Sequence, residues 1–173
     1  NQLMLKRLQT NLEETHYGDL DELYGRAFGF RRLESESYSY NPKSNLLTGE
    51  QMDEVETKDA MYRARIYKYM LAFQYGGTAY GIQLAAESAC AKPCNVLEAW
   101  KFYEGVNVAD GDQAALTPGY YEQANYNEYI VVVDDAEVTE ADRYNINKVT
   151  KNIRPQDAIM TVVQRDEFFD KLI

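Results

Sequence analysis

The sequence has few of the residues that most often carry enzyme chemistry. Its 173 residues include a single histidine, His16, and only two cysteines. His16 has no identifiable serine or cysteine partner, so the residues offer no nucleophile paired with a base. Cys90 and Cys94 are separated by three residues rather than the two of a thioredoxin-like motif, and no second pair completes a zinc site. We therefore interpret them as reduced, partly buried thiols at a helix end.

Long hydrophobic runs are also missing. No segment approaches the roughly 18 to 20 apolar residues of a membrane span, and no signal-peptide pattern opens the chain. We expect a soluble, non-secreted protein with no membrane partner. Because the sequence begins with Asn1 rather than methionine, we assume that the true N-terminus has been removed.

Basic residues are absent from one long stretch. Between Phe102 and Asp142 the chain has ten acidic residues and no Lys or Arg, and its overall net charge is −10. Such a block repels phosphate backbones, so we expect no nucleic-acid partner. Two interpretations of the block stay open, namely a solvated acidic face and a docking face for a basic partner.

Nucleotide and metal motifs are not recognisable either. The glycines form no phosphate-binding loop and no dinucleotide fingerprint. The densest carboxylate cluster is Asp134, Asp135, Glu137, Glu140 and Asp142. Its spacing does not match an EF-hand, and acids at a helix start are explained by the helix dipole. We expect no cofactor, no metal and no catalytic activity. A metal-assisted hydrolase that uses this carboxylate cluster is kept as an alternative hypothesis.

What the sequence does have is 45% apolar residues and 15 tyrosines. The apolar fraction suffices for a real core. A tyrosine ring with a polar tip suits interfaces, although half-buried positions at the rim of a core account for it equally well.

Helical periodicity dominates the first half of the chain. Residues 1–45 predict two short N-terminal helices followed by a serine-rich polar linker from Glu34 to Asn45. Residues 46–92 predict an antiparallel helical hairpin. Its long first helix starts at a Thr48–Gln51 capping box and ends at Gly76–Gly77, and its second helix is capped by Thr78 and ends near Cys90.

Alternating and continuous apolar patterns follow in residues 93–173. They predict a strand after Pro93, a central strand at EYIVVVD, a helix capped by Thr139 that Pro155 ends, and a strand from Ala158 to Val163. The segment 104–127 between the first two strands predicts a long contact loop. We predict an α+β fold, with N-terminal helices and a long helical hairpin followed by a small β-β-α-β module.

The order of these pieces resembles the tail protein I family of phage baseplates, over roughly Asp19 to Val163. The similar segments are YRARIYKYMLAFQYGGTAYGIQLAAESAC, EYIVVVD and NIRPQDAIMTV. The resemblance implies a structural virion protein of the contractile tail, made in the host cytoplasm. In the baseplate wedge it would bundle with two copies of a baseplate J-like protein and link to a tail fibre or fibre adaptor. It also implies that Arg154–Pro155 is a structural hinge and that no enzyme is involved.

Thin amphipathic helices and many tyrosines are typical of an assembly component. We predict that the partner proteins cover one set of side chains, which consists of Leu5, Leu8, Leu12, Leu23, Phe28, Met52, Val55, Tyr62, Ile66, Tyr69, Tyr120 and Tyr121. The alternative hypothesis is a stand-alone cytosolic adaptor domain that binds a basic partner through the acidic, Tyr-rich loop.

Overall fold

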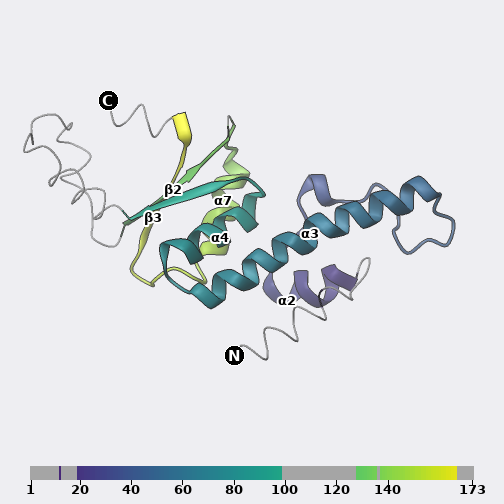
Figure 1. Cartoon of the computed structure of the whole chain (residues 1–173), viewed down its shortest axis with the longest axis horizontal. Coiled ribbons are helices and arrows are strands. Elements are labelled where there is room, and N and C mark those ends of the chain that lie inside the picture. Colours follow the sequence, from purple (N-terminus) through teal and green to yellow (C-terminus); the bar gives the residue numbers. More distant parts are fainter. Residues whose placement is uncertain (1–11, 13–18, 99–127, 136, 167–173) are drawn as a thin grey trace, which may run out of the picture. The chain divides into compact units, whose positions relative to one another are not determined.

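The computed structural model describes residue 12 and residues 19–98, 128–135 and 137–166. The chain forms two compact units, residues 1–70 and residues 71–173. Within the described residues, helices precede a small sheet of mixed direction, which confirms the predicted α+β class (Figure 1).

The two long helices occur where the sequence predicts them. Helix α3 spans Gly49–Tyr75 and helix α4 spans Ala79–Cys90. The Thr48 hydroxyl accepts a hydrogen bond from the Gln51 amide at 3.3 Å, and the Gln51 side chain accepts one from the Thr48 amide at 3.0 Å. The Thr78 hydroxyl caps α4 by accepting from the Gly81 amide at 3.1 Å. The boundary between the units falls inside α3, so α4 belongs with the sheet rather than to a separate region of residues 46–92.

In the first unit, short helical segments lie on α3. A π-helical turn η1 (Asp21–Gly25) continues into α2 (Arg26–Phe28), which ends at Gly29 with a positive φ of 65°. The ring of Phe30 stacks on Tyr69 at 5.2 Å between centroids, and the Tyr62 hydroxyl donates to the Phe30 carbonyl at 2.7 Å. These contacts attach the N-terminal segment to α3.

This packing corrects part of the predicted partner interface. Five of its residues are almost fully buried within the chain, namely Leu12, Val55, Tyr62, Ile66 and Tyr69. Val55, Tyr62, Ile66 and Tyr69 recur every three to seven residues and form the apolar stripe of α3. This stripe is therefore covered by the protein itself, with Phe28 and Phe30 packed on Tyr69. The stripe was interpreted as unsatisfied because its cover lies more than thirty residues away in sequence, where periodicity carries no information.

The predicted polar linker is also corrected in part. A 3₁₀ turn, η2 (Glu34–Glu36), opens this segment, and Glu36 is only 1% exposed. Further along, the hydroxyl of Tyr40 donates to the Gln51 carbonyl at 2.9 Å. The first part of the segment is therefore packed on α3 through polar side chains, which composition alone does not distinguish from a solvated linker.

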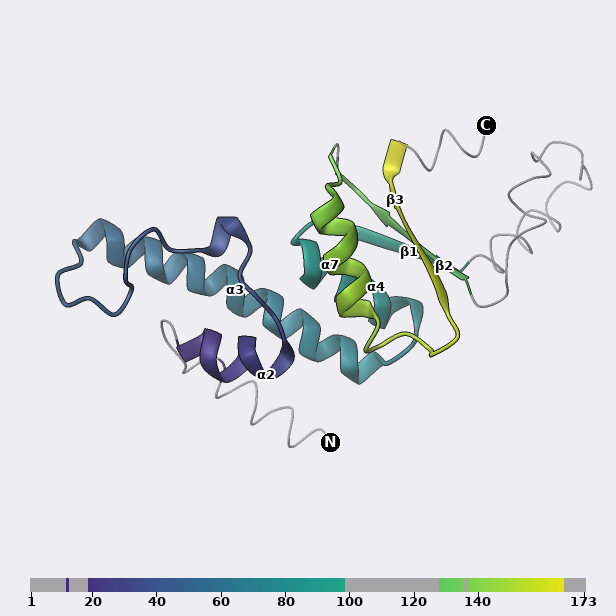
Figure 2. The ribbon, with the colours of Figure 1, turned by 180° about the vertical axis from the view of Figure 1, so that it is seen from behind.

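The second unit contains the sheet, in the order β1 (Cys94–Glu98), β2 (Glu128–Val133) and β3 (Ile159–Gln164). Strands β1 and β2 are antiparallel, whereas β2 and β3 are parallel. Helix α7 (Glu140–Thr150) connects the parallel pair, so the predicted strand–helix–strand crossover is confirmed. The views from both sides show α4 and α7 on the same side of the sheet (Figures 1 and 2).

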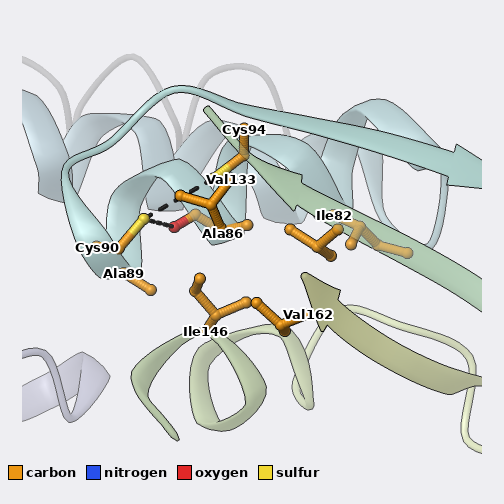
Figure 3. Close-up of a cluster of buried hydrophobic side chains, with 9 residues drawn as sticks. Ile82, Ala86, Ala89, Cys90, Cys94, Val133, Ile146 and Val162 are labelled. Carbon is orange, nitrogen blue, oxygen red and sulfur yellow. Dashed lines mark hydrogen bonds between the residues drawn. The ribbon is translucent and has the colours of Figure 1, made fainter. Parts of the chain in front are cut away.

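The core of this unit lies between the two helices and the sheet. Alternate residues of β2, Val131 and Val133, point into it and pack with Cys94 of β1 and Val162 of β3. From the helices come Ile82 and Ala86 of α4 and Ile146 of α7 (Figure 3). The small residues of α4 let it pack closely, as expected for an alanine-rich face.

The Arg154–Pro155 step lies beyond the end of α7. The helix ends at Thr150, whose hydroxyl donates to the Ile146 carbonyl at 2.6 Å, and the amides of Ile153 and Arg154 close a turn on the Thr150 carbonyl. The prediction that Pro155 itself ends the helix is therefore wrong by about one turn. Pro155 instead packs close to Gly77, where an added β-carbon would lie 3.1 Å from the proline ring.

A close approach at Gly81 generates a test of this packing. A β-carbon on Gly81 would overlap the Gly76 carbonyl oxygen and lie 3.2 Å from that of Ala72. Overpacking of this kind costs about 1–3 kcal/mol, so we expect Gly81→Ala to lower the free energy of unfolding measured in urea. The control is Gly49→Ala, which meets nothing within 4 Å and should be neutral or slightly stabilising. Equal stability of the two variants would contradict the close approach.

Candidate functional site

An apolar groove lies at the start of α3 in the first unit. It has a volume of about 520 Å³ and is lined by Asp19, Pro42, Lys43, Ser44, Asn45, Leu47 and Met52. The side chain of Met52 is 45% exposed, and that of the neighbouring Leu46 is 89% exposed. Exposed apolar side chains beside a groove with a polar rim are typical of protein-binding surfaces. We call Leu46, Leu47 and Met52 the apolar patch.

Local sequence explains how the apolar patch forms. With Thr48 as the N-cap of α3, Leu47 is the residue before the cap and Met52 is the fourth residue of the helix. Hydrophobic residues at these two positions commonly pack together and fix the angle at which the chain enters the helix. Leu47 and Met52 line the same groove, as this motif requires. Leu46 lies outside the motif and is left to the solvent.

Polar contacts hold the loop that carries the patch. Lys43 forms an ion pair of 2.8 Å with Asp19 at the rim of the groove. The hydrogen bond to Asp19 is the main reason that the pKa of Lys43 is raised. The Asn41 side chain accepts a hydrogen bond from the Lys43 amide at 3.0 Å, and the Ser44 hydroxyl accepts from the Leu46 amide at 3.3 Å. These turn contacts fix the position of the backbone that presents Leu46.

A buried charge network holds the preceding segment on α3. The Arg32 guanidinium contacts both oxygens of Asp21 at 2.9 Å and one oxygen of Asp59 at 2.6 Å. It also lies over the rings of Tyr38 and Tyr62, at 4.5 and 4.4 Å from their centroids. Burial alone would lower the pKa of Arg32, but the bonds to Asp59 and Asp21 raise it. Arg32 is therefore held charged between an aromatic pair and two carboxylates.

A second buried pair lies beside the first. Arg65 of α3 forms an ion pair with Glu36, whose carboxylate also accepts from the Leu33 amide at 2.9 Å. The Arg65 guanidinium lies 4.6 Å from the centroid of the Phe30 ring. The other Glu36 oxygen, Oε1, is buried and has no hydrogen-bond partner in the described part of the chain.

Tyr38 completes the network by donating from its hydroxyl to Asp59. Burial is the largest cause of the raised pKa of Tyr38, and the bond to Asp59 raises it further. Asp59, which interrupts the apolar stripe of α3 in the sequence, is thus a partner for Arg32 and Tyr38. The network binds its own charged groups to one another, and its evident effect is to position residues 32–40 on the helix.

The acidic cluster of the second unit has a cation of its own. The Lys92 ammonium lies 2.9 Å from Asp142 and 3.1 Å from Asp135, and it donates to the Glu137 carbonyl at 2.6 Å. Burial alone would raise the pKa of Asp142, but hydrogen bonds from Lys92 and Thr139 lower it. Within the described residues, no group of three or more His, Cys, Asp or Glu is placed to hold a metal ion. Lys92 thus pairs with Asp135 and Asp142, two of the five carboxylates in the predicted cluster.

The remaining predicted interface residues are exposed, half-buried or outside the described residues. Leu23 and Met52 are exposed, at 61% and 45%, and Phe28 is half-buried. Leu5, Leu8, Tyr120 and Tyr121 lie outside the described residues. The predicted interface did not include Leu46 and Leu47. Two leucines between Asn45 and the helix cap, in an otherwise polar segment, could have indicated an exposed apolar site.

Comparisons with known proteins identify the family of this chain but not its function. The model of a family described as "Family of unknown function (DUF7297)" matches residues 1–167, and the chain therefore belongs to this family. No curated protein and no solved structure gives a significant match. Among the described helices, none is long and apolar enough to cross a membrane.

The buried ion pair predicts a large effect of one substitution. Arg65→Met leaves the Glu36 carboxylate buried without its cation, and breaking such a pair costs about 3–5 kcal/mol. We expect urea unfolding to show this loss, and the double variant Arg65→Met with Glu36→Leu to recover most of it. Arg26→Met is the control, because its ion pair with Glu22 is largely exposed. If Arg65→Met is as stable as Arg26→Met, the pair does not support the fold.

Tyr62 predicts a loss of stability at alkaline pH. Burial raises the pKa of Tyr62 to about 12, whereas the pKa of a tyrosine in the unfolded chain is about 10. Because the folded state holds the proton more tightly, this contribution is complete below about pH 10 and is lost as the pH rises towards about 12. In urea unfolding across this range, Tyr62→Phe should lose less stability with pH than the wild type. Tyr144→Phe, at a 66% exposed position, should keep the wild-type slope.

Proposed function

We propose that this member of the DUF7297 family is a structural assembly component that binds a partner protein through the apolar patch. The observation that carries the proposal is the exposure of Leu46, which is 89% accessible on a loop held by side-chain hydrogen bonds. Burying a leucine side chain contributes about 1.5–3 kcal/mol, so a partner that covers Leu46 and Met52 gains several kcal/mol.

The organisation of the patch favours protein binding over simple exposure. Its apolar centre is bordered by the Lys43–Asp19 ion pair, as a polar rim borders the core of an interface. The loop is held by contacts within the chain, so a partner need not order it on binding. A surface fixed before the encounter loses less conformational entropy in the complex.

The assembly that we propose is the wedge of a contractile-tail baseplate, within a phage virion. The support for this choice is the similarity of the sequence segments to the tail protein I family. The element order agrees with it, because an α3–α4 pair precedes the β2–α7–β3 crossover. The partners in this proposal are two copies of a baseplate J-like protein, and a tail fibre or fibre adaptor. The role is structural, without catalysis.

Co-expression with a baseplate J-like protein tests the proposal. We expect the full chain to co-purify with it, and the double variant Leu46→Asp with Met52→Asp to bind at least tenfold more weakly, since tenfold corresponds to about 1.4 kcal/mol. Tyr144→Asp, at another exposed position on α7, is the matched control and should bind normally.

The possible outcomes test the baseplate-wedge assignment and the docking role of the apolar patch separately. A chain that stays alone with every J-like subunit excludes the baseplate wedge. A complex that the double variant forms as tightly as the wild type keeps the wedge but removes the apolar patch as its docking surface. Circular dichroism of each variant shows whether α3 still forms.

A further inference from the structure

The two cysteines lie together at the junction between helix α4 and the sheet. Cys90 is the last residue of α4 and Cys94 is the first residue of β1. Their sulfur atoms are 3.8 Å apart, and each side chain is at most 4% exposed. Figure 3 shows the two side chains directed toward one another across the turn.

The backbone of the turn keeps the thiols in this arrangement. Ala91, the residue after α4, adopts the left-handed conformation with φ of 57°. This conformation ends the helix, and β1 begins three residues later. The carbonyl of Lys92 accepts from both thiols, at 3.8 Å from Cys90 and 3.4 Å from Cys94. The rest of the core holds both ends, because Cys90 and Cys94 belong to the cluster that contains Val131 and Ile146.

The arrangement is close to that of a disulfide but is not one. The sulfur atoms of a disulfide are about 2.05 Å apart, so bond formation requires an approach of roughly 2 Å. Both cysteines are in the reduced form in this structure, without a disulfide between them.

The two thiols are chemically unequal. The hydrogen bond shared with Cys94 lowers the pKa of Cys90 and a backbone hydrogen bond with Lys92 lowers it further, whereas burial has the opposite effect. A thiolate, not a thiol, is the nucleophile in cysteine oxidation. The Cys90 sulfur is therefore assigned the first reaction, and the Cys94 sulfur, 3.8 Å away, the second.

We propose that Cys90 and Cys94 form a modification site at which a peroxide generates an intramolecular disulfide. The Cys90 thiolate attacks hydrogen peroxide, which breaks the O–O bond and yields a sulfenic acid and, after proton uptake, water. The Cys94 sulfur then displaces the hydroxyl group from Cys90, forming the S–S bond and releasing a second water. The two sulfurs lose two electrons together, and one peroxide is reduced to two waters.

The product joins the end of α4 to the start of β1 covalently. A bond across a short loop restricts the unfolded chain, so the oxidised protein should melt a few degrees above the reduced one. The site is independent of the apolar patch, which belongs to the other unit.

Peroxide treatment of the folded full chain tests the proposal. After treatment, the protein is unfolded, remaining thiols are alkylated, and a proteolytic peptide that carries both cysteines is analysed by mass. We expect this peptide to have lost two hydrogens and to carry no alkyl group, and prior reduction with dithiothreitol to restore two alkylated thiols. The melting temperature of oxidised and reduced protein is compared in parallel.

Two variants complete the experiment. Cys94→Ser removes the second sulfur, so the Cys90 of this variant should gain oxygen or stay alkylatable. Cys90→Ser should react several-fold more slowly with peroxide than Cys94→Ser does. Two alkylatable thiols in the treated wild type overturn the proposal, as do oxygen adducts or disulfides between chains in place of the internal bond. Because the wild-type measurement stands alone, a variant that fails to fold does not weaken it.

Discussion

The first unit depends on the pairing of buried charges between the segment at residues 31–38 and α3. Arg32 and Arg65 carry two positive charges into a region where Asp59 and Glu36 are almost fully buried. Such pairs add little net stability over apolar residues of the same size, but removing one partner leaves a costly unpaired charge. The register of the segment on α3 places Arg32 against Asp59 and Glu36 against Arg65. The ion pairs therefore specify the arrangement of the unit, while the stacked rings of Phe30, Tyr62 and Tyr69 supply its apolar contacts.

The same constraint explains which features could be predicted from the sequence. Each correctly predicted boundary has a local signal, such as the Thr48–Gln51 box, the Thr78 cap and the Thr139–Asp142 box, where both side chains reach the backbone within one turn. The continuous apolar run of β2 and the crossover through α7 also follow from local pattern. Glu36 and Arg65 are twenty-nine residues apart and Tyr62 and Phe30 are thirty-two apart. No local pattern indicates such pairings, so residues 34–45 resembled a linker and the α3 stripe resembled a free surface.

The candidate site was predictable to the same extent. Met52 is in the predicted set because it belongs to the periodic stripe, and it is exposed because it precedes the covered part of α3. Leu46 and Leu47 interrupt a polar segment outside any period, so a search for stripes passes over them. Leu47 and Met52 are recognisable as neighbours only when their positions are counted from Thr48, the N-cap of α3. The hydroxyl of Tyr40 contacts the Gln51 carbonyl and the Glu54 carboxylate, and so holds the chain just before this loop at the start of α3.

Strand order has a consequence for synthesis on the ribosome. The central strand β2 pairs with β1, which has already been made, and with β3, which begins at Ile159 after all of α7. Residues 1–70 can complete their unit while the rest of the chain is still being translated. Between the emergence of β2 and that of β3, however, the valines of β2 border an open strand edge, the kind of edge on which nascent chains pair with one another. The length of the α7 crossover therefore sets the interval during translation in which this edge of β2 stays unpaired.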